Sequence, residues 1–321
     1  MTKRLLISDG HFSLKVCPTE MEIILRSILK VTGQQTALGE WIIRHYEWQK
    51  ATHITAALEQ SCANAPYDGL ISLGDSLSGW NNVGLDLDDD DTKEALQYKE
   101  ILIKKLGLTP DRQVWVPGNH DLGYYNCSFS SLGSDWPQAK NFASFTELYG
   151  PTYGLINLSD ELSFIWLSTA HVETLNVKAD KTDDSKLAFL IKQQREELDF
   201  LSTVLDHLSG KFILGIHDPG SFLSPQLQAI LNPHLPQLVA SFTGHLHAEW
   251  LLQFFKLVRP NFRSVMNKYR IQFIPSIWGV VLPFFFWPTG AGWAELEISG
   301  PSAHLHLHTI GIKKIKTIFL C

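Results

Sequence analysis

The chain has 321 residues, 45% of them hydrophobic, and a formal net charge of −6 at pH 7 with an isoelectric point near 6.1. This length and apolar content allow a large core, and no long Pro-, Gly- or Ser-rich linker divides the sequence, so we predict one elaborated domain over residues 1–321. The negative charge is concentrated in residues 86–91, which we place in a loop. It disfavours a protein that binds nucleic acid through its phosphate backbone.

The first residues and the cysteines bear on the compartment. The apolar run after Lys3 and Arg4 is interrupted by Asp9, too early for a signal peptide. The most apolar stretch, Val280–Trp287, is far shorter than the ~20 residues that a membrane span needs. The four cysteines show no CxxC spacing, so neither a thiolate zinc site nor a disulfide framework is indicated. We therefore expect a cytoplasmic protein without a membrane span.

Strand-like and helical patterns alternate through the first two-thirds of the chain, and strand-like segments dominate the rest. Helical periodicity predicts helices over about 20–31, 38–62 and 186–208, the last with Ile191 on its broad apolar face. Extended segments are predicted at 270–277, 293–298 and 304–309. Five short apolar runs have the character of strands: Arg4–Ser8, Leu70–Leu73, Val114–Val116, Phe212–Ile216 and Leu238–Thr243. The alternation predicts an α/β fold with mixed sheets.

Residue types that bind metals follow each of these five runs. The clusters are Asp9-Gly10-His11, Gly74-Asp75, Gly118-Asn119-His120-Asp121, His217, and Gly244-His245-Leu246-His247. Each alone is common in turns, but loops that leave strand ends gather at one rim of a sheet and build a site there. Two divalent ions held ~3.5–4 Å apart need one bridging carboxylate, for which we choose Asp75. The thiolate-free donors suit Mn, Fe, Zn, Ni or Mg, with Mn or Fe/Zn preferred.

The order DxH, GD, GNHD, single His and GHxH, spread from Arg4 to about Ile298, resembles the calcineurin-like metallophosphoesterase superfamily. The resemblance implies a four-layer αββα sandwich of two mixed β-sheets with a dinuclear metal centre at the rim. It implies that His120 contacts the substrate phosphate or protonates the leaving group, and that Asp121 orients His120. It also implies a shared set of metal ligands, with Asp9, His11 and His247 on one ion, Asn119, His217 and His245 on the other, and Asp75 between them.

The predicted activity is hydrolysis of a small phosphorylated molecule, with a nucleotide or a lipid-linked compound as candidates, by a metal-bridging hydroxide. A phosphodiester or pyrophosphate is preferred as substrate. A phosphomonoesterase or nuclease of the same superfamily is the alternative, and a non-catalytic scaffold of the same fold has the least support because no ligand position is lost. After Asp75 the chain reads Ser76-Leu77-Ser78, where many members of the family keep a further Asp or Asn.

Three segments carry open alternatives, and a fourth is assigned to specificity. A helical insertion at about 14–48 is either packed on the sheet exterior or a lid that presents Trp41, Tyr46 and Trp48 to substrate. Val280–Trp287 is a core strand with a buried turn or an apolar groove wall, and we favour the strand. Tyr124–Pro151 is predicted as a loop that contributes to specificity. In the last predicted strand, His304, His306 and His308 alternate with apolar residues. They form either a metal patch or the exposed face of a terminal strand, and we favour the exposed face.

Overall fold

The computed structural model describes the chain outside five long segments and several short ones. The described residues are 1–10, 59–63, 66–76, 90–123, 139–168, 184–245, 260–276, 280–281, 288–289, 292–300, 302–309 and 312–320. The predicted insertion at 14–48 and its aromatic residues lie outside them, as do the candidate ligands His11 and His247 and most of Val280–Trp287. Residues 59–63 are helical, at the end of the predicted helix 38–62.

The first sheet has six strands in the order β13-β12-β11-β1-β2-β3. Strands β1, β2 and β3 are parallel, while β1, β11, β12 and β13 pair antiparallel, so the sheet is mixed. The strands are β1 Thr2–Ile7, β2 Gly69–Ser72, β3 Gln113–Trp115, β11 Gly292–Ser299, β12 Ser302–Thr309 and β13 Ile312–Phe319.

The second sheet has five strands in the order β4-β5-β6-β7-β8. Its strands β5 to β8 are parallel and β4 is antiparallel to β5, so this sheet is mixed as well. The strands are β4 Gly154–Asn157, β5 Leu162–Leu167, β6 Lys211–Ile216, β7 Leu238–Thr243 and β8 Ile271–Phe273. A separate two-stranded ribbon joins β9 Val280–Val281 and β10 Pro288–Thr289.

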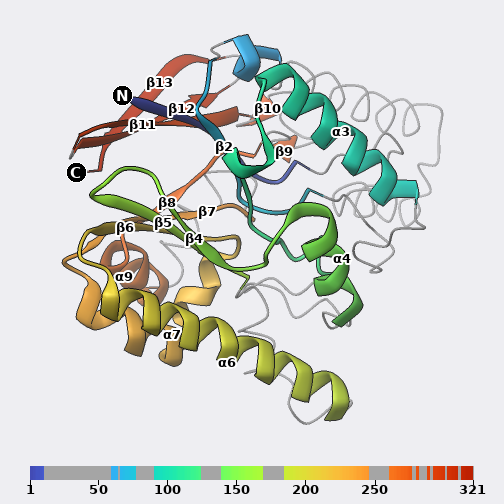
Figure 1. Cartoon of the computed structure of the whole chain (residues 1–321). Helices are drawn as coiled ribbons and strands as arrows, with labels where there is room; N and C mark the ends of the chain where they lie inside the picture. Colours follow the sequence, from blue (N-terminus) through green and yellow to red (C-terminus); the bar gives the residue numbers. More distant parts are fainter. Residues whose placement is uncertain are drawn as a thin grey trace, which may run out of the picture.

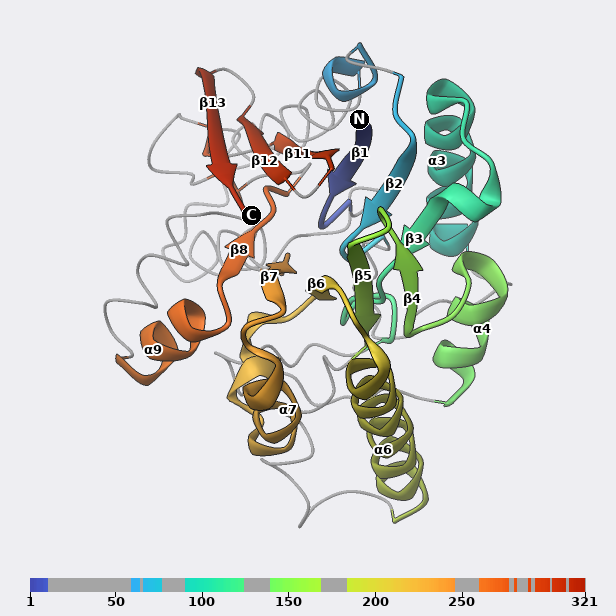
Figure 2. The same cartoon turned by 60° about the vertical axis from the view of Figure 1, so that its left-hand side comes forward.

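Helices cover the outer faces of both sheets (Figures 1 and 2). Helices α3 Asp90–Leu106 and α4 Ala139–Tyr149 lie over the first sheet, and α6 Asp184–His207, α7 Pro225–Leu231 and α9 Pro260–Lys268 lie over the second. Short 3₁₀ turns complete the connections at η1 Pro110–Arg112, η4 Pro219–Leu223 and η5 Asn232–His234.

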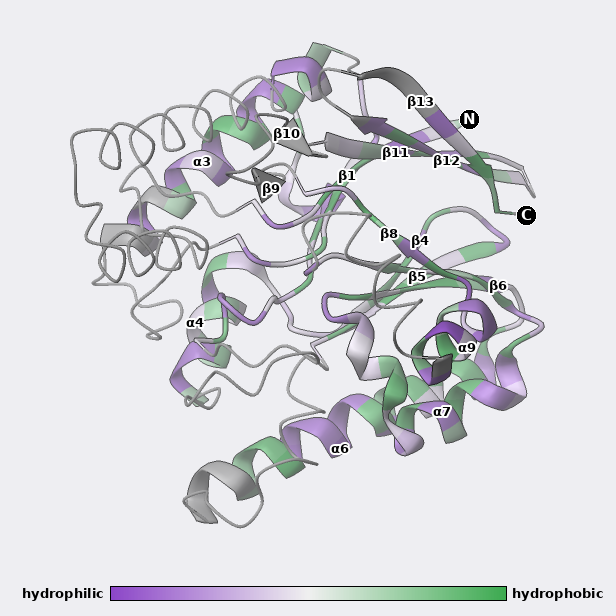
Figure 3. Ribbon diagram, turned by 180° about the vertical axis from the view of Figure 1, so that it is seen from behind, coloured by the Kyte–Doolittle hydropathy of each residue, from purple (hydrophilic) through white to green (hydrophobic). Residues whose placement is uncertain are grey.

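Side chains alternate along the strands and so feed separate apolar layers. Leu5 and Ile7 of β1 pack outward with the helices α3 and α4, whereas Leu6 packs inward against the second sheet. In β5, Phe164 faces the first sheet and Ile165 faces the helices of the other side. In Figure 3, hydrophilic and hydrophobic residues alternate along helix α6, as expected for a helix with one face on the sheet. The layers are helix, sheet, sheet, helix, which confirms the predicted four-layer αββα sandwich.

The predicted strands and the third helix are confirmed within a few residues. The prediction for Ile191 is wrong, because its side chain is 44% exposed. The acidic run at 86–91 is not wholly a loop, since α3 begins at Asp90. Acidic residues are favoured in the first turn of a helix because they face the positive end of its dipole.

Several elements were not predicted, among them α3, α7, α9, β4 and β5. Two further ones, α4 and β13, correct a stated prediction. Within Tyr124–Pro151, predicted as a loop, residues 139–149 form α4, whose buried residues recur at helical spacing. Strand β13 follows β12 and forms the edge of the first sheet, so β12 is an internal strand. Its histidines are only partly exposed, which corrects the prediction of an exposed face on a terminal strand.

None of the helices in the described part of the chain combines the length and apolar character that crossing a bilayer requires.

Candidate metal centre

The carboxyl ends of five strands meet at one rim of the two sheets. Parallel pairing aligns the ends of β1, β2 and β3 in the first sheet and of β6 and β7 in the second. A single parallel bridge between Ser8 and Ser276 joins the sheets at this rim. The residues that follow these strand ends are Asp9, Asp75, Asn119, His217 and His245, as the sequence predicted.

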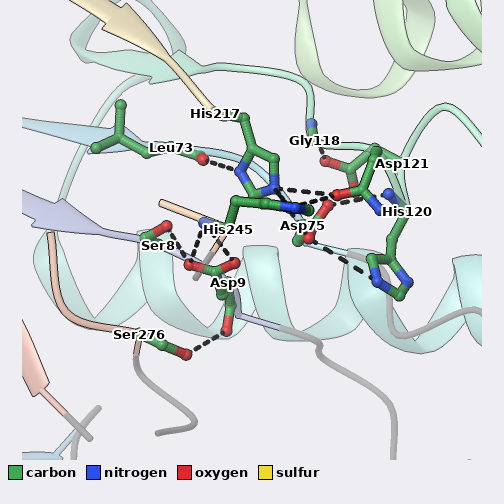
Figure 4. A network of polar contacts seen from close by, with 11 residues as sticks. Ser8, Asp9, Leu73, Asp75, Gly118, His120, Asp121, His217, His245 and Ser276 are labelled. Carbon is green, nitrogen blue, oxygen red and sulfur yellow. Dashed lines mark hydrogen bonds and ion pairs between the residues drawn. The ribbon is translucent and has the colours of Figure 1, made fainter. Parts of the chain in front are cut away.

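Four of these side chains point toward one another (Figure 4). His217 Nε2 lies 3.0 Å from Asp75 Oδ2, 3.2 Å from Asn119 Oδ1 and 3.3 Å from His245 Nδ1. His245 Nδ1 is also 2.9 Å from Asn119 Oδ1. Asp75 and His217 are fully buried, so this group of donor atoms is closed on its inner side.

A backbone carbonyl fixes the orientation of His217. Its Nδ1 lies 2.6 Å from the carbonyl oxygen of Leu73, and because a carbonyl only accepts, Nδ1 carries the proton. Nε2 of the neutral ring then presents a lone pair to two oxygen acceptors, Asp75 Oδ2 and Asn119 Oδ1. Such a group of lone pairs requires a cation among them, either a proton or a metal ion. Metal-binding histidines are commonly held by a carbonyl in this way.

The pKa of the His217 imidazole supports the same conclusion. Burial lowers this pKa, but the nearby Asp75 carboxylate outweighs burial and Asp9 adds to its effect, so the pKa rises to about 9. The carboxylates that raise this pKa make the site negative, which favours a positive charge there.

Asp9 lies at the other end of the group. The backbone N–H of His245 donates to both carboxylate oxygens of Asp9, at 3.0 and 3.2 Å, and the hydroxyl of Ser8 donates to Oδ2. Ser276 donates from its hydroxyl to the carbonyl of Asp9 at 3.2 Å. A carboxylate has about four lone-pair positions, so these bonds orient Asp9 and leave it capacity to bind a metal.

A compact turn at Gly118–Gly123 carries Asn119 and His120. The carboxylate of Asp121 accepts from the N–H of Gly118 at 2.9 Å, and Asp75 Oδ1 accepts from the N–H of His120 at 3.0 Å. His120 Nε2 lies 4.0 Å from Asp75 Oδ2. Asp121 thus closes the turn, and its predicted role in orienting His120 stays a prediction.

The candidate ligands adopt an uncommon backbone conformation. Asp9, Asp75 and His245 have φ of 48°, 52° and 69°. Arg270 is the other described non-glycine residue in this region, at 51°. Non-glycine residues rarely have positive φ, although Asp, Asn and His tolerate it best, and such strain concentrates at functional sites. Three of these four residues are candidate ligands, so the strain marks the rim.

Two glycines allow the close approach of these segments. Gly74 has φ +94°, and a Cβ there would lie 2.5 Å from His217 Nδ1. A Cβ on Gly118 would overlap the carboxylate of Asp75. Any side chain at either position would displace a candidate ligand.

The sequence did not reveal the groups that hold these ligands. Ser8 carried the one available signal, because it directly precedes Asp9. The Leu73 carbonyl and the Ser276 hydroxyl have no signal in the sequence, since their roles depend on how the two sheets pack.

Comparisons with known proteins add little to this geometry. No protein-family model and no curated protein sequence matches the chain. The vacuolar protein sorting 29 structure from Cryptosporidium parvum is similar at 10% identity and a TM-score of 0.38, covering 99% of this chain and 96% of that chain. A single mutant of Vps29 from Entamoeba histolytica is similar at 10% identity and a TM-score of 0.34, covering 99% and 98%. The interpretation of the site therefore rests on its own geometry.

Proposed function

We propose that this chain is a metal-dependent phosphoric ester hydrolase that acts on a small phosphorylated molecule. The observation that carries the proposal is the convergence of Asp75, Asn119, His217 and His245 at the sheet rim, with His217 held by the Leu73 carbonyl so that its free nitrogen faces the group.

The donor set fits a divalent metal. It offers one carboxylate, one amide oxygen and two imidazoles, with no thiolate and no lysine or arginine among them. This combination suits Mn, Fe, Zn or Ni better than Mg, and Mn or Fe/Zn is preferred. A second ion would be held by Asp9 together with His11 and His247, with Asp75 shared between the two ions.

When bound, the two ions would supply a water nucleophile of lowered pKa and positive charge beside the phosphoryl oxygens. The chain's own residues have separate tasks. Asp75 and His217, fully buried, keep the inner side of the centre dry. His120 has a partly exposed side chain at the rim, and we assign it either protonation of the leaving oxygen or binding of the substrate phosphate.

The substrate class follows from charge and from the resemblance in motif order. We favour a phosphodiester or pyrophosphate, nucleotide or lipid-linked, over a phosphomonoester. The net charge of −6 disfavours nucleic acid as substrate, because it repels a phosphate backbone.

Metal analysis and turnover test the proposal together. The purified chain should contain up to two divalent ions after incubation with Mn, Fe, Ni or Zn, and should hydrolyse bis-p-nitrophenyl phosphate when Mn is added. A chain that stays free of metal would remove the basis of the proposal. A chain that binds metal without any turnover on diesters, monoesters or pyrophosphates would instead be a non-catalytic scaffold of this fold.

A further inference from the structure

The turn that carries Asn119 and His120 is held from two sides. On the inner side, Asp75 accepts from the backbone of His120 at 3.0 Å. On the outer side, the side-chain amide of Asn141 donates to the carbonyl of Leu122 at 2.8 Å. Asn141 lies in α4, outside every motif that the sequence indicated.

Three backbone N–H groups of the turn donate to acceptors within it. The N–H of Leu122 donates to the carbonyl of Gly118 at 3.2 Å, and the N–H of Gly123 donates to the carbonyl of His120 at 3.1 Å. Gly118 in turn donates to Asp121. The Leu122 carbonyl links the turn to α4 by a hydrogen bond.

The Asn141 amide can donate a hydrogen bond to the Leu122 carbonyl, but burying this polar side chain in the core is energetically unfavourable. Its side chain is fully buried, and its Oδ1 has no hydrogen-bond partner among the described residues. Because Nδ2 donates to a carbonyl, the amide cannot rotate to exchange its oxygen and nitrogen without losing that bond. A buried unpaired acceptor is unfavourable, so a purely structural position would favour an apolar residue.

Helix α4, which carries Asn141, is packed tightly against the first sheet. Phe145 and Tyr149 of α4 stack on each other with ring centroids 5.2 Å apart, and Tyr149 also packs on Trp115, the last residue of β3, at 5.1 Å. Leu122 itself is buried in the same apolar cluster. The strand before the turn and the helix behind it thus form one packed unit.

We propose that Asn141 is a positioning residue, which holds the Gly118–Gly123 turn through Leu122 so that Asn119 and His120 face the metal centre. This inference rests on the proposed function. Asn119 Oδ1 lies 2.9 Å from His245 and 3.2 Å from His217, distances that leave little room for displacement. A shift of ~1 Å at a reacting group can cost on the order of 10²-fold in rate.

The test compares Asn141→Leu with Phe142→Leu. Leu has the same number and branching of side-chain heavy atoms as Asn, but it is bulkier and has no donor. Phe142, the next residue of α4, packs on Phe189 of α6 at 5.3 Å and so controls for loss of packing. Each variant is assayed well below its Tm for Mn affinity, and for kcat and KM on methyl p-nitrophenyl phosphate and methyl phenyl phosphate.

Asn141→Leu should weaken Mn binding and lower kcat by roughly 10-fold or more, within the 10–100-fold range of lost supporting contacts at metal sites. The loss should be greater for the phenyl ester, whose leaving group depends more on protonation. Phe142→Leu should lower Tm with kcat, KM and Mn affinity unchanged. Should Asn141→Leu not fold, Asn141→Ala removes the donor without adding bulk, and the same kinetic losses are expected.

Wild-type kinetics and Mn affinity in a folded Asn141 variant would overturn the inference while leaving the proposed function intact. Equal losses in the Phe142 control would also overturn it, because packing would then explain the effect. A wild-type chain without metal or turnover would instead refute the proposed function.

Discussion

Histidines and carboxylates gather at two places in the described part of this molecule, and their arrangement differs between them. At the sheet rim, Asp75, His217 and His245 leave three different strands, and their ligand atoms all lie within 4.8 Å of one another. The second gathering, on the outer face of the first sheet, is spread along two neighbouring strands, β11 and β12.

On that outer face each acid has its own partner. Glu297 Oε2 lies 3.3 Å from His306 Nε2, and Glu295 Oε2 lies 3.3 Å from His308 Nε2. Glu295 also pairs with the ammonium group of Lys3 at 3.2 Å. Each carboxylate is thus paired with a side chain of the protein itself.

The two gatherings contain the same residue types and differ in their position on the strands. Residues two apart on one strand face are separated by about 7 Å, so their side chains stand side by side and meet neighbours on the next strand. The rings of His304 and His306 are parallel with centroids 6.3 Å apart, too far to share an ion as they stand. Loops at strand ends have no such spacing and can converge.

The largest expected effect is at Asp75, which we expect to touch both ions. Asp75→Asn should remove metal from both positions and lower turnover by more than the 10²–10⁴-fold typical of a lost general acid, because both ions and their water are affected. Asn119→Ala should weaken mainly one ion. Metal content per chain and kcat on bis-p-nitrophenyl phosphate measure both changes. Full metal content in Asp75→Asn would move the bridging role elsewhere.

The next largest loss of activity is expected on substitution of His120. If His120 protonates the leaving oxygen, His120→Asn should keep both metals and lose on the order of 10²–10⁴-fold in kcat on poor leaving groups. The loss should shrink for p-nitrophenol, which needs little protonation. Losses of equal size for good and poor leaving groups would assign His120 to phosphate binding.

These rim residues could be predicted from the sequence because each directly follows a strand whose apolar run is visible. Asp75 after Leu70–Leu73 and His217 after Phe212–Ile216 are examples. The long helix α6 was predictable from its periodic apolar residues, whereas the arrangement of the strands in two sheets was implied by the family resemblance. What could not be predicted depends on the packing of distant segments, as in the positive φ of Asp75 and the Leu73 carbonyl that orients His217.

The elements that were missed had weak patterns. The apolar residues of α4 at Phe142, Phe145 and Tyr149 have helical spacing, but they follow a stretch rich in Ser, Asn and Gly that is typical of a loop. Strand β13 contains Lys313, Lys314 and Lys316, so it lacks clear alternation. Lysines are common on edge strands because they discourage pairing with other chains, which explains the pattern once the topology is known.

A third prediction tests the role of the outer face in stability. Burial raises the pKa of Glu295, but hydrogen bonds from His308, Tyr67 and Lys3 outweigh it and lower the pKa to about 2. Glu295→Gln should therefore lower the free energy of unfolding at pH 7 by roughly 1–3 kcal/mol, the range for bonds to charged groups. Metal content should not change, and Glu297→Gln, whose side chain is 32% exposed, is the matched control with a smaller effect.

The difference in unfolding free energy between wild type and Glu295→Gln should decrease as the pH falls. A carboxylate whose pKa is lower in the folded chain than its ordinary 4.5 stabilises the fold above pH 4.5, and this stabilisation is lost as the pH falls through about 2. Urea unfolding of wild type and Glu295→Gln at pH 7, 4.5 and 3 should show the gap narrowing toward low pH. A gap that stays constant would assign the effect to packing and not to charge.

The smallest effect is expected at His306, and it decides whether the outer face is a second metal site. The His306–Glu297 pair is partly exposed, with 23% and 32% of the side chains accessible, and such pairs contribute about 0–1 kcal/mol because solvent screens them. The hydroxyl oxygen of Thr317 lies 3.0 Å from His306 Nδ1, and His306→Gln keeps a polar side chain near it. We expect the unfolding free energy to change by no more than this amount, and the metal content and kcat to match wild type. Wild-type protein that binds a third ion, lost in His306→Gln, would show that histidines along a strand face can rearrange into a metal site. The distinction between strand ends and strand faces would then fail for this fold.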